Sequence, residues 1–352
     1  MTRTRVLFPA LIAVLAMGSC RGGCRRGEDR AATVEGRLAL FPVATKVVAA
    51  IDVARLRASP AAAKLSEKAQ QDQGDAREIA EFARRTGFDP LRQLGSVTVA
   101  FPEEARLHGE MGLVLRADDL DEARLVAYAR DQLQKSGDDL VATAHGRFTL
   151  WSSKRDPDLV AFFIDRQTFA LGAGGWGPRM ADLAESARPV DSAATDVDLT
   201  NLVERAAGAH AIWAAAIVPE STRKSLSADP RFADAASILT LSAGIDLGKG
   251  LDAQLLADLA TAAEAKSLAL KVTEATRDAR RNPQVLMLGI GPYLDGVTAT
   301  AKDHTFDLRA TLNEAAFDDL LARLGGLLAL MRGGGAVPIP VPAPPPPGAV
   351  GH

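Results

Sequence analysis

The sequence contains two stretches with the same pattern of residues, and this internal repeat constrains the fold more than any other feature. Residues 113–127 and 255–269 each read as an apolar strand, a short turn and the start of a helix, which opens with Glu-Ala and a basic residue. A strand pattern precedes each stretch, at 96–101 and at 238–243. Because a repeated order of elements is typical of a duplicated structural unit, we expect two related halves.

Two further pairs of segments follow the same order along the chain. Residues 168–171 (TFAL) match residues 305–308 (TFDL), and the apolar residues 47–51 match residues 212–217. Each half therefore reads as strand, helix, strand, strand, helix, strand. We predict that residues 46–187 superpose on residues 210–332 in strand order.

Alternation of apolar and polar residues predicts strands in both halves. In the first half the expected strands are 46–53, 94–101, 110–117, 147–152, 159–165 and 168–172, and in the second they are 211–218, 237–246, 252–259, 296–301 and 304–311. Within 251–259 every second residue is apolar, so one face of that strand is packed and the other is wetter. The fold class we predict is α+β, with each half a mainly antiparallel sheet and helices packed on one face.

The remaining segments complete a predicted domain organisation. We expect a signal peptide at 1–19, a lipidated tether at 20–34, a first α+β repeat at 35–187, a linker with the start of the second half at 188–209, a second repeat at 210–332, and a disordered Gly/Pro-rich tail at 333–352. The Gly-rich stretch 172–177 follows a strand and predicts a tight turn into a helix. Thr311 and Glu314 form a candidate capping box for the last helix.

The N-terminus has the form of an export signal. Arg3 and Arg5 precede an apolar run at 6–17, and small residues lead to Cys20. This run is too short to span a bilayer, which takes about 20 apolar residues. The segment therefore predicts export from the cytoplasm rather than a transmembrane helix.

The segment Ala16-Met17-Gly18-Ser19-Cys20 resembles the lipobox of bacterial lipoproteins, with Met17 where Leu is usual. This resemblance implies cleavage before Cys20 and attachment of diacylglycerol to its thiol. With its repeated build, the chain resembles duplicated α+β lipoproteins of bacterial envelopes, a resemblance that supplies no activity. Ordinary signal cleavage is the alternative, and it would leave Cys20 and Cys24 free to pair in a secreted or periplasmic soluble protein.

The predicted location is the bacterial cell envelope, with the membrane contacted through the N-terminal lipid. Lipoprotein sorting rules treat Asp after the modified cysteine as a signal for inner-membrane retention. Arg21 stands there, so the resemblance favours the outer membrane. The formal net charge is −3, which argues against nucleic-acid binding. The expected partner is therefore an unknown component of the envelope.

The sequence names no catalytic residue, no metal site and no cofactor. The five histidines are not spaced as metal ligands, and neither H-E-x-x-H nor G-x-S-x-G occurs. Trp151 and Trp176 flank loops of the first half, so we consider them candidates to line a ligand groove.

The function predicted from the sequence is that of a non-catalytic envelope lipoprotein that acts by binding or scaffolding. Two alternatives stay open. The first is a periplasmic carrier of a lipid or other hydrophobic ligand, which requires an apolar cavity. The second is a hydrolase with a site assembled from scattered acids and serines, which requires a cleft where acids converge.

Overall fold

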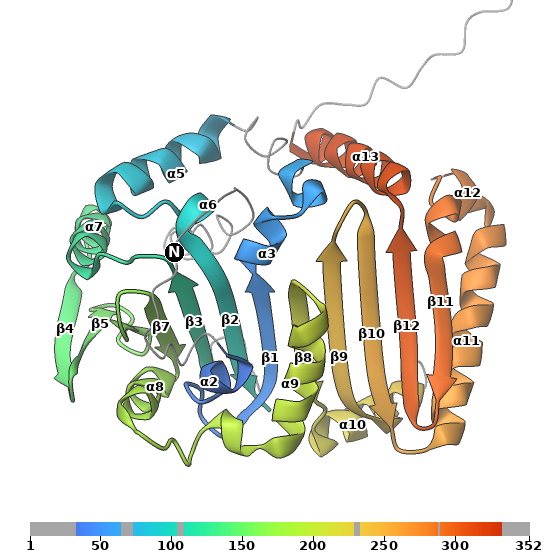
Figure 1. Ribbon diagram of the computed structural model, residues 1–352, viewed down its shortest axis with the longest axis horizontal. Coiled ribbons are helices and arrows are strands. Elements are labelled where there is room, and N and C mark those ends of the chain that lie inside the picture. Colours follow the sequence, from blue (N-terminus) through green and yellow to red (C-terminus); the bar gives the residue numbers. More distant parts are fainter. Residues whose placement is uncertain (1–32, 65–72, 104–108, 229–232, 288, 333–352) are drawn as a thin grey trace, which may run out of the picture.

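The computed structural model describes residues 33–64, 73–103, 109–228, 233–287 and 289–332. These residues form one twelve-stranded antiparallel sheet in the order β11-β12-β10-β9-β8-β1-β2-β3-β7-β6-β5-β4 (Figure 1). The α+β class and the antiparallel pairing predicted from the sequence are confirmed. The predicted signal peptide, the tail at 333–352 and nearly all of the tether lie outside the described residues.

The strands are β1 (Thr45–Asp52), β2 (Leu94–Pro102), β3 (Met111–Ala117), β4 (Leu140–His145), β5 (Phe148–Ser153), β6 (Val160–Phe163), β7 (Thr168–Ala173), β8 (Ile212–Ile217), β9 (Ile238–Leu247), β10 (Leu251–Leu259), β11 (Val297–Lys302) and β12 (Thr305–Leu312). The helices are α2 (Val34–Leu38), α3 (Val53–Arg57), α5 (Gln73–Thr86), α6 (Pro90–Gln93), α7 (Glu122–Lys135), α8 (Trp176–Glu185), α9 (Val197–Ala209), α10 (Glu220–Ser227), α11 (Ala262–Arg281), α12 (Pro283–Met287) and α13 (Glu314–Arg332). Short 3-10 turns are η2 (Ala193–Thr195), η3 (Ala233–Ser237) and η4 (Gly291–Gly296).

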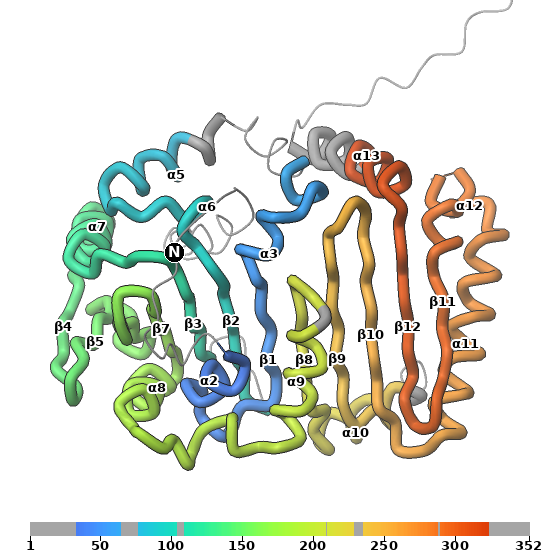
Figure 2. The backbone as a smooth tube through the Cα atoms, in the orientation of Figure 1, coloured from blue at the N-terminus to red at the C-terminus, as the bar shows by residue number. Residues whose placement is uncertain are grey.

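The two halves meet where β1 pairs with β8 in the middle of the sheet, and Figure 2 shows these strands side by side. Outward from this pair, β1-β2-β3-β7-β6 on one side matches β8-β9-β10-β12-β11 on the other. Ala49 lies opposite Ala214, with Val48 opposite Ala215 and Ala50 opposite Trp213. An internal two-fold arrangement requires corresponding strands to pair at its centre, and β1 and β8 hold corresponding places in the two halves. Superposition of the halves, and hence their duplication, stays a prediction.

Strand registers agree with the proposed repeat at one place and shift at another. Leu113 lies opposite Leu171 in the first half, and Leu255 lies opposite Leu308 in the second, as the sequence matches require. However, Val97 lies opposite Leu115, whereas Leu241 lies opposite Ala257. The match of 96–101 with 238–243 is therefore displaced by two residues, a displacement that preserves the alternation of faces.

The two faces of the sheet are covered differently, and we name each after a helix. The α9 face carries Val48, Val114 and Trp213, and α2, α8 and α9 pack on it. The α11 face carries Val97 and Leu255. In the first half it packs on residues of α3, α5 and α7, and in the second half on α11.

The prediction of helices on one face is wrong for the first half. Strands β2 and β3 direct apolar side chains to both sides, Val114 to one and Val97 and Leu115 to the other. Each apolar face must be covered to exclude water, so helices flank both.

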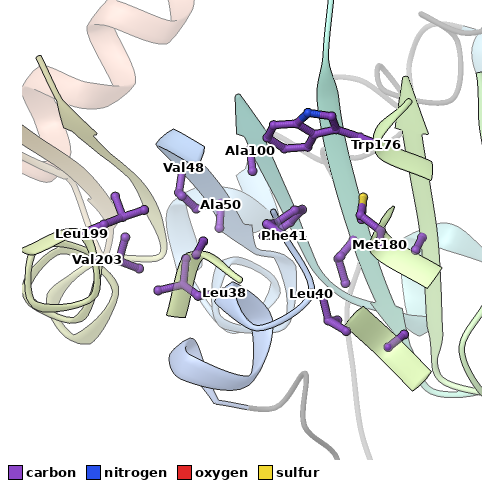
Figure 3. Packing of buried hydrophobic residues seen from close by; sticks show 14 of the residues in the cluster. Leu38, Leu40, Phe41, Val48, Ala50, Ala100, Trp176, Met180, Leu199 and Val203 are labelled. Atoms are coloured by element: carbon purple, nitrogen blue, oxygen red, sulfur yellow. The ribbon is translucent and has the colours of Figure 1, made fainter. Parts of the chain in front are cut away.

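The α9-face core joins the two halves. Phe41 and Trp176 are fully buried there, in one cluster with Val48 of the central strand β1 and with Leu199 and Val203 of α9 (Figure 3). The segment 188–209, predicted as a linker with the start of the second half, therefore includes a packed helix. The halves consequently share this core and one sheet, while each half has a separate core on the α11 face.

Strands predicted by alternation all occur, with ends displaced by a few residues at most. The pattern at 251–259 is confirmed, because Ala257 and Leu259 are buried under α11 while Asp252 is exposed. The edge strand β4 was not predicted, because most of its side chains are exposed and show no apolar alternation. Asn313 caps α13, because its Oδ1 accepts the Ala316 N–H at 2.9 Å. The predicted cap, Thr311, is instead paired within β12.

The Gly-rich stretch is the tight turn that the sequence predicted, between β7 and α8. Gly174 and Gly175 have positive φ angles of 61° and 85°, which favour glycine. A Cβ on Gly172 would fall on the backbone of Gly177, so strand and helix approach each other too closely for a side chain.

Substitution Gly172→Ala is expected to lower the free energy of unfolding by about 1–3 kcal/mol, because backbone must move to admit the methyl group. Gly208→Ala is the matched control: Gly208 is an exposed residue of α9 with nothing within 4 Å of the added Cβ. There we expect no loss and a gain of at most about 1 kcal/mol. Denaturant unfolding of both variants measures the difference, and equal effects would refute the close approach.

Candidate binding groove beside the edge strand β11

The two tryptophans predicted to line a ligand groove do not come together. Trp176 is fully buried on the α9 face, where it opens α8. Trp151 lies in β5 on the opposite face, and its Nε1–H donates to Oε1 of Glu122 on α7 at 3.2 Å. The sheet separates the two indoles. Trp176 serves the core, so the prediction of a shared groove at these residues is wrong.

The carboxylates with displaced pKa values lie in hydrogen-bonded and ion-paired networks. Asp258 of β10 is half-buried, and its oxygens accept from Thr305 at 2.7 Å, Thr240 at 2.8 Å and Arg205 at 3.1 Å. Partial burial by itself would raise the pKa of Asp258, but the hydrogen bonds from Thr305, Thr240 and Arg205 outweigh it and lower the pKa. Asp258 is thus held ionised, and it ties α9 to β9, β10 and β12. A carboxyl group that acts as a general acid near neutral pH needs a raised pKa instead.

The hollow beside this network is too small for a ligand. It lies between α9 and strands β9 and β10, is lined by Arg205, His210 and Gln254 among others, and has a volume of about 10 Å³. That volume holds at most one water molecule. It therefore lends no support to the carrier predicted as an alternative. Among the described residues, no group of three or more His, Cys, Asp or Glu side chains is arranged to hold a metal ion.

A much larger hollow lies at the opposite end of the second half, between α11 and the edge strand β11. Its volume is about 630 Å³, and it is open to solvent. We call it the β11 groove, and its lining residues are Ala262, Lys266, Ala269, Leu270, Thr273, Ala299, Thr300, Ala301 and Asp303.

Spacing along the chain explains the groove. On α11, Ala262, Lys266, Ala269 and Thr273 follow one another at intervals of three or four, so they share one face of the helix, and Leu270 lies beside Ala269. Thr261 starts this helix, since its Oγ1 accepts the Glu264 N–H at 3.3 Å. On β11, Ala299 and Ala301 point to the α11 face, because they lie opposite Leu308 and Phe306. Small side chains on both walls leave the space open.

The groove walls are mostly apolar and carry little charge. Leu270 is 56 % exposed although it is a large hydrophobic residue. Lys266 and Asp303 are the charged lining residues, and Lys266 forms no ion pair within the described ranges of the chain. Further large apolar side chains are exposed in α12, at Leu286 (57 %) and Met287 (88 %). Helix α12 lies at the end of α11, beside β11 (Figure 1).

This groove was not predicted from the sequence. The sequence pattern that marks the groove is the row of small residues on one face of α11. The same pattern is typical of a helix face packed against a sheet. Which strand lies at the edge of a sheet depends on pairing between distant segments, and no local pattern reveals it.

Comparisons with known proteins give no family. No family model matches the sequence, and no curated protein matches it. Among solved structures, crystal form I of TP0453 is similar, with a TM-score of 0.40 and 8 % sequence identity over 84 % of this chain and 96 % of that chain. A likeness at this level carries no argument about function. None of the helices in the described ranges combines the length and apolar character needed to cross a membrane.

Substitution Asp258→Asn is expected to destabilise the protein by about 1–3 kcal/mol at pH 7, because hydrogen bonds to a charged acceptor are lost. The pKa of Asp258 is lower in the folded state. The ionised side chain of Asp258 therefore adds to the free energy of unfolding above its unfolded-state pKa of about 4. This stabilisation is lost as the pH falls through the lower pKa of the folded state. Denaturant unfolding at pH 7 and pH 3 should show a difference between wild type and variant that shrinks in acid. A constant difference would contradict this assignment.

Proposed function

We propose that the protein is a non-catalytic lipoprotein of the bacterial envelope, held at the outer membrane through lipid on Cys20, which binds a partner protein in the β11 groove. The observation that carries the proposal is the groove itself: a hollow of about 630 Å³ with exposed apolar side chains, beside the strand that ends the sheet within the described residues. Exposed apolar surface at a concave site is typical of a binding surface.

The chemistry of the walls favours binding over catalysis. Alanine, leucine and threonine side chains line most of the groove, and its lining contains no histidine, cysteine or glutamate. Lys266 and Asp303 contribute one charge of each sign. Such a surface supports recognition by shape and apolar contact, with an ion pair at Lys266 to set orientation.

The N-terminal segment supports the anchor. Basic residues follow Cys20 directly, at Arg21, Arg25 and Arg26, and attract anionic lipid headgroups. Stable attachment takes two acyl chains or one chain with a basic patch, and a diacylglyceryl cysteine meets this requirement.

Substitution Cys20→Ala is expected to move the protein from the membrane fraction to the soluble fraction, because it removes the acylated thiol. Cys24→Ala is the matched control and should leave the protein with the membrane. Cell fractionation measures the distribution, and intact mass of the N-terminal peptide measures lipid on Cys20. Unmodified Cys20 in the wild type would contradict the anchor.

A photo-crosslinking residue at Leu270 is expected to form an adduct with an envelope protein in living cells, whereas the same residue at Val190 should not. Val190 is 72 % exposed and lies outside the groove, so it controls for accessibility. Adding Lys266→Glu should reduce the Leu270 adduct at least about fivefold, since it reverses the charge in the groove. Equal adducts at both positions, or an adduct indifferent to Lys266→Glu, would refute groove binding.

A further inference from the structure

We propose that the partner enters the β11 groove as an extended segment that pairs with β11 and continues the sheet by one strand. This inference rests on the proposed function and specifies the partner's chemistry: an extended polypeptide with small apolar side chains on one face and an acidic side chain near Lys266.

Strand β11 has backbone groups with no strand to pair with. It ends the sheet on this side, with β12 as its neighbour within the described residues. Asp303 and His304 form the turn to β12, with Asp303 at a φ of 52°, and Lys302 lies opposite Thr305. In such a tight hairpin the residues that flank the turn bond to each other, and along an antiparallel pair the bonded positions alternate.

This alternation directs the N–H and C=O groups of Ala299 and Ala301 away from β12. A hydrogen bond on the other side of β12 supports this alternation. The Leu259 N–H of β10 donates to the His304 carbonyl at 2.9 Å, so His304 bonds towards β10 and the next residue, Thr305, bonds towards β11. Both alanines line the groove. Free backbone donors and acceptors therefore lie at the same place as the open apolar hollow, which is the arrangement used when a peptide adds to a sheet edge.

The opposite edge of the sheet provides a comparison within the same molecule. Strand β4 has the same run as β11, Ala-Thr-Ala and a basic residue, before a tight turn with a positive φ of 54° at Gly146. There the side chain of His145 bonds to Asp182 of α8 at 2.7 Å, whereas Lys302 at the same position of β11 forms no ion pair within the described residues. No apolar wall comparable to Leu270 overhangs it in the structure as described, since the side chains of β4 are mostly exposed.

The groove determines which side chains the added strand carries. Residues of a strand alternate between faces, so every second side chain of the partner enters the hollow under α11. Ala262, Ala269 and Leu270 leave room there for small apolar side chains. The intervening side chains lie beside Thr298 and Thr300, which are exposed and favour polar neighbours. Lys266 has no ion pair within the described residues and offers its charge to a carboxylate of the partner.

The test uses the full-length protein and a phage-displayed library of random linear peptides as the probe. Enriched peptides are synthesised, and their dissociation constants are measured by fluorescence anisotropy for wild type, Ala301→Pro and Ala144→Pro. Proline at Ala301 removes the outward N–H but leaves the side-chain space nearly unchanged, and an edge strand tolerates it. Ala144 occupies the same position before the turn of β4, so Ala144→Pro is the matched control.

We expect peptides with alternating small apolar residues and an acid, with affinity at least tenfold weaker for Ala301→Pro and unchanged for Ala144→Pro. Lys266→Glu should weaken these peptides about fivefold, and exchanging the peptide acid for lysine should restore binding. Thermal unfolding of each variant shows that it is folded.

Three outcomes would overturn the proposal: no enrichment on wild type, equal losses in Ala301→Pro and Ala144→Pro, or a wild-type dimer that Ala301→Pro dissociates, since a second copy would then occupy the edge. A Leu270 crosslink in cells that survives Ala301→Pro would refute strand addition while leaving the proposed binding function intact.

Discussion

The pairing of β1 with β8 is the interaction on which the rest of the structure depends. It places Ala49 opposite Ala214 at the centre of the sheet, and it brings Val48, Ala50, Trp213 and Ala215 to one face, where all four are buried. Helix α9 packs over these residues together with α2, and the two helices contact each other. Without this pair each half would expose both an apolar face and a long strand edge, so the halves stabilise each other through the core they share on the α9 face.

The same central pairing decides what lies at the outer edges. Beyond β3 the first half adds β7, β6, β5 and β4, and α8 covers the α9 face there. Beyond β10 the second half adds β12 and β11, which ends the sheet within the described residues. On these outer strands the α9 face carries Asp307 and Arg309, which are polar and need no covering helix. Helix α13, which follows β12 as α8 follows β7, lies instead at the end of the strands (Figure 1). These differences leave β11 exposed beside α11.

Local pattern predicted most of the fold, and pairing between distant segments determined the rest. Alternation located the strands because one face of most of them is packed, and it failed at β4, where neither face is. The capping interaction at α13 was misplaced by two residues, because Thr311 belongs to the sheet and Asn313 is the first residue free to cap. Trp176 and Trp151 are close in the sequence but lie on opposite faces of the sheet. The β11 groove combines a helix face with a sheet edge, and neither is recognisable before the strand order is known.

Amide hydrogen exchange of the free, full-length protein, resolved at single residues of β11, would show whether this edge is open. We expect the amide of Thr300 to be protected by β12, whereas those of Ala299 and Ala301 should exchange at least a hundredfold faster because they face an open edge. Equal protection of all three amides would mean that a segment of the protein already covers this edge. The groove would then not be available to a partner.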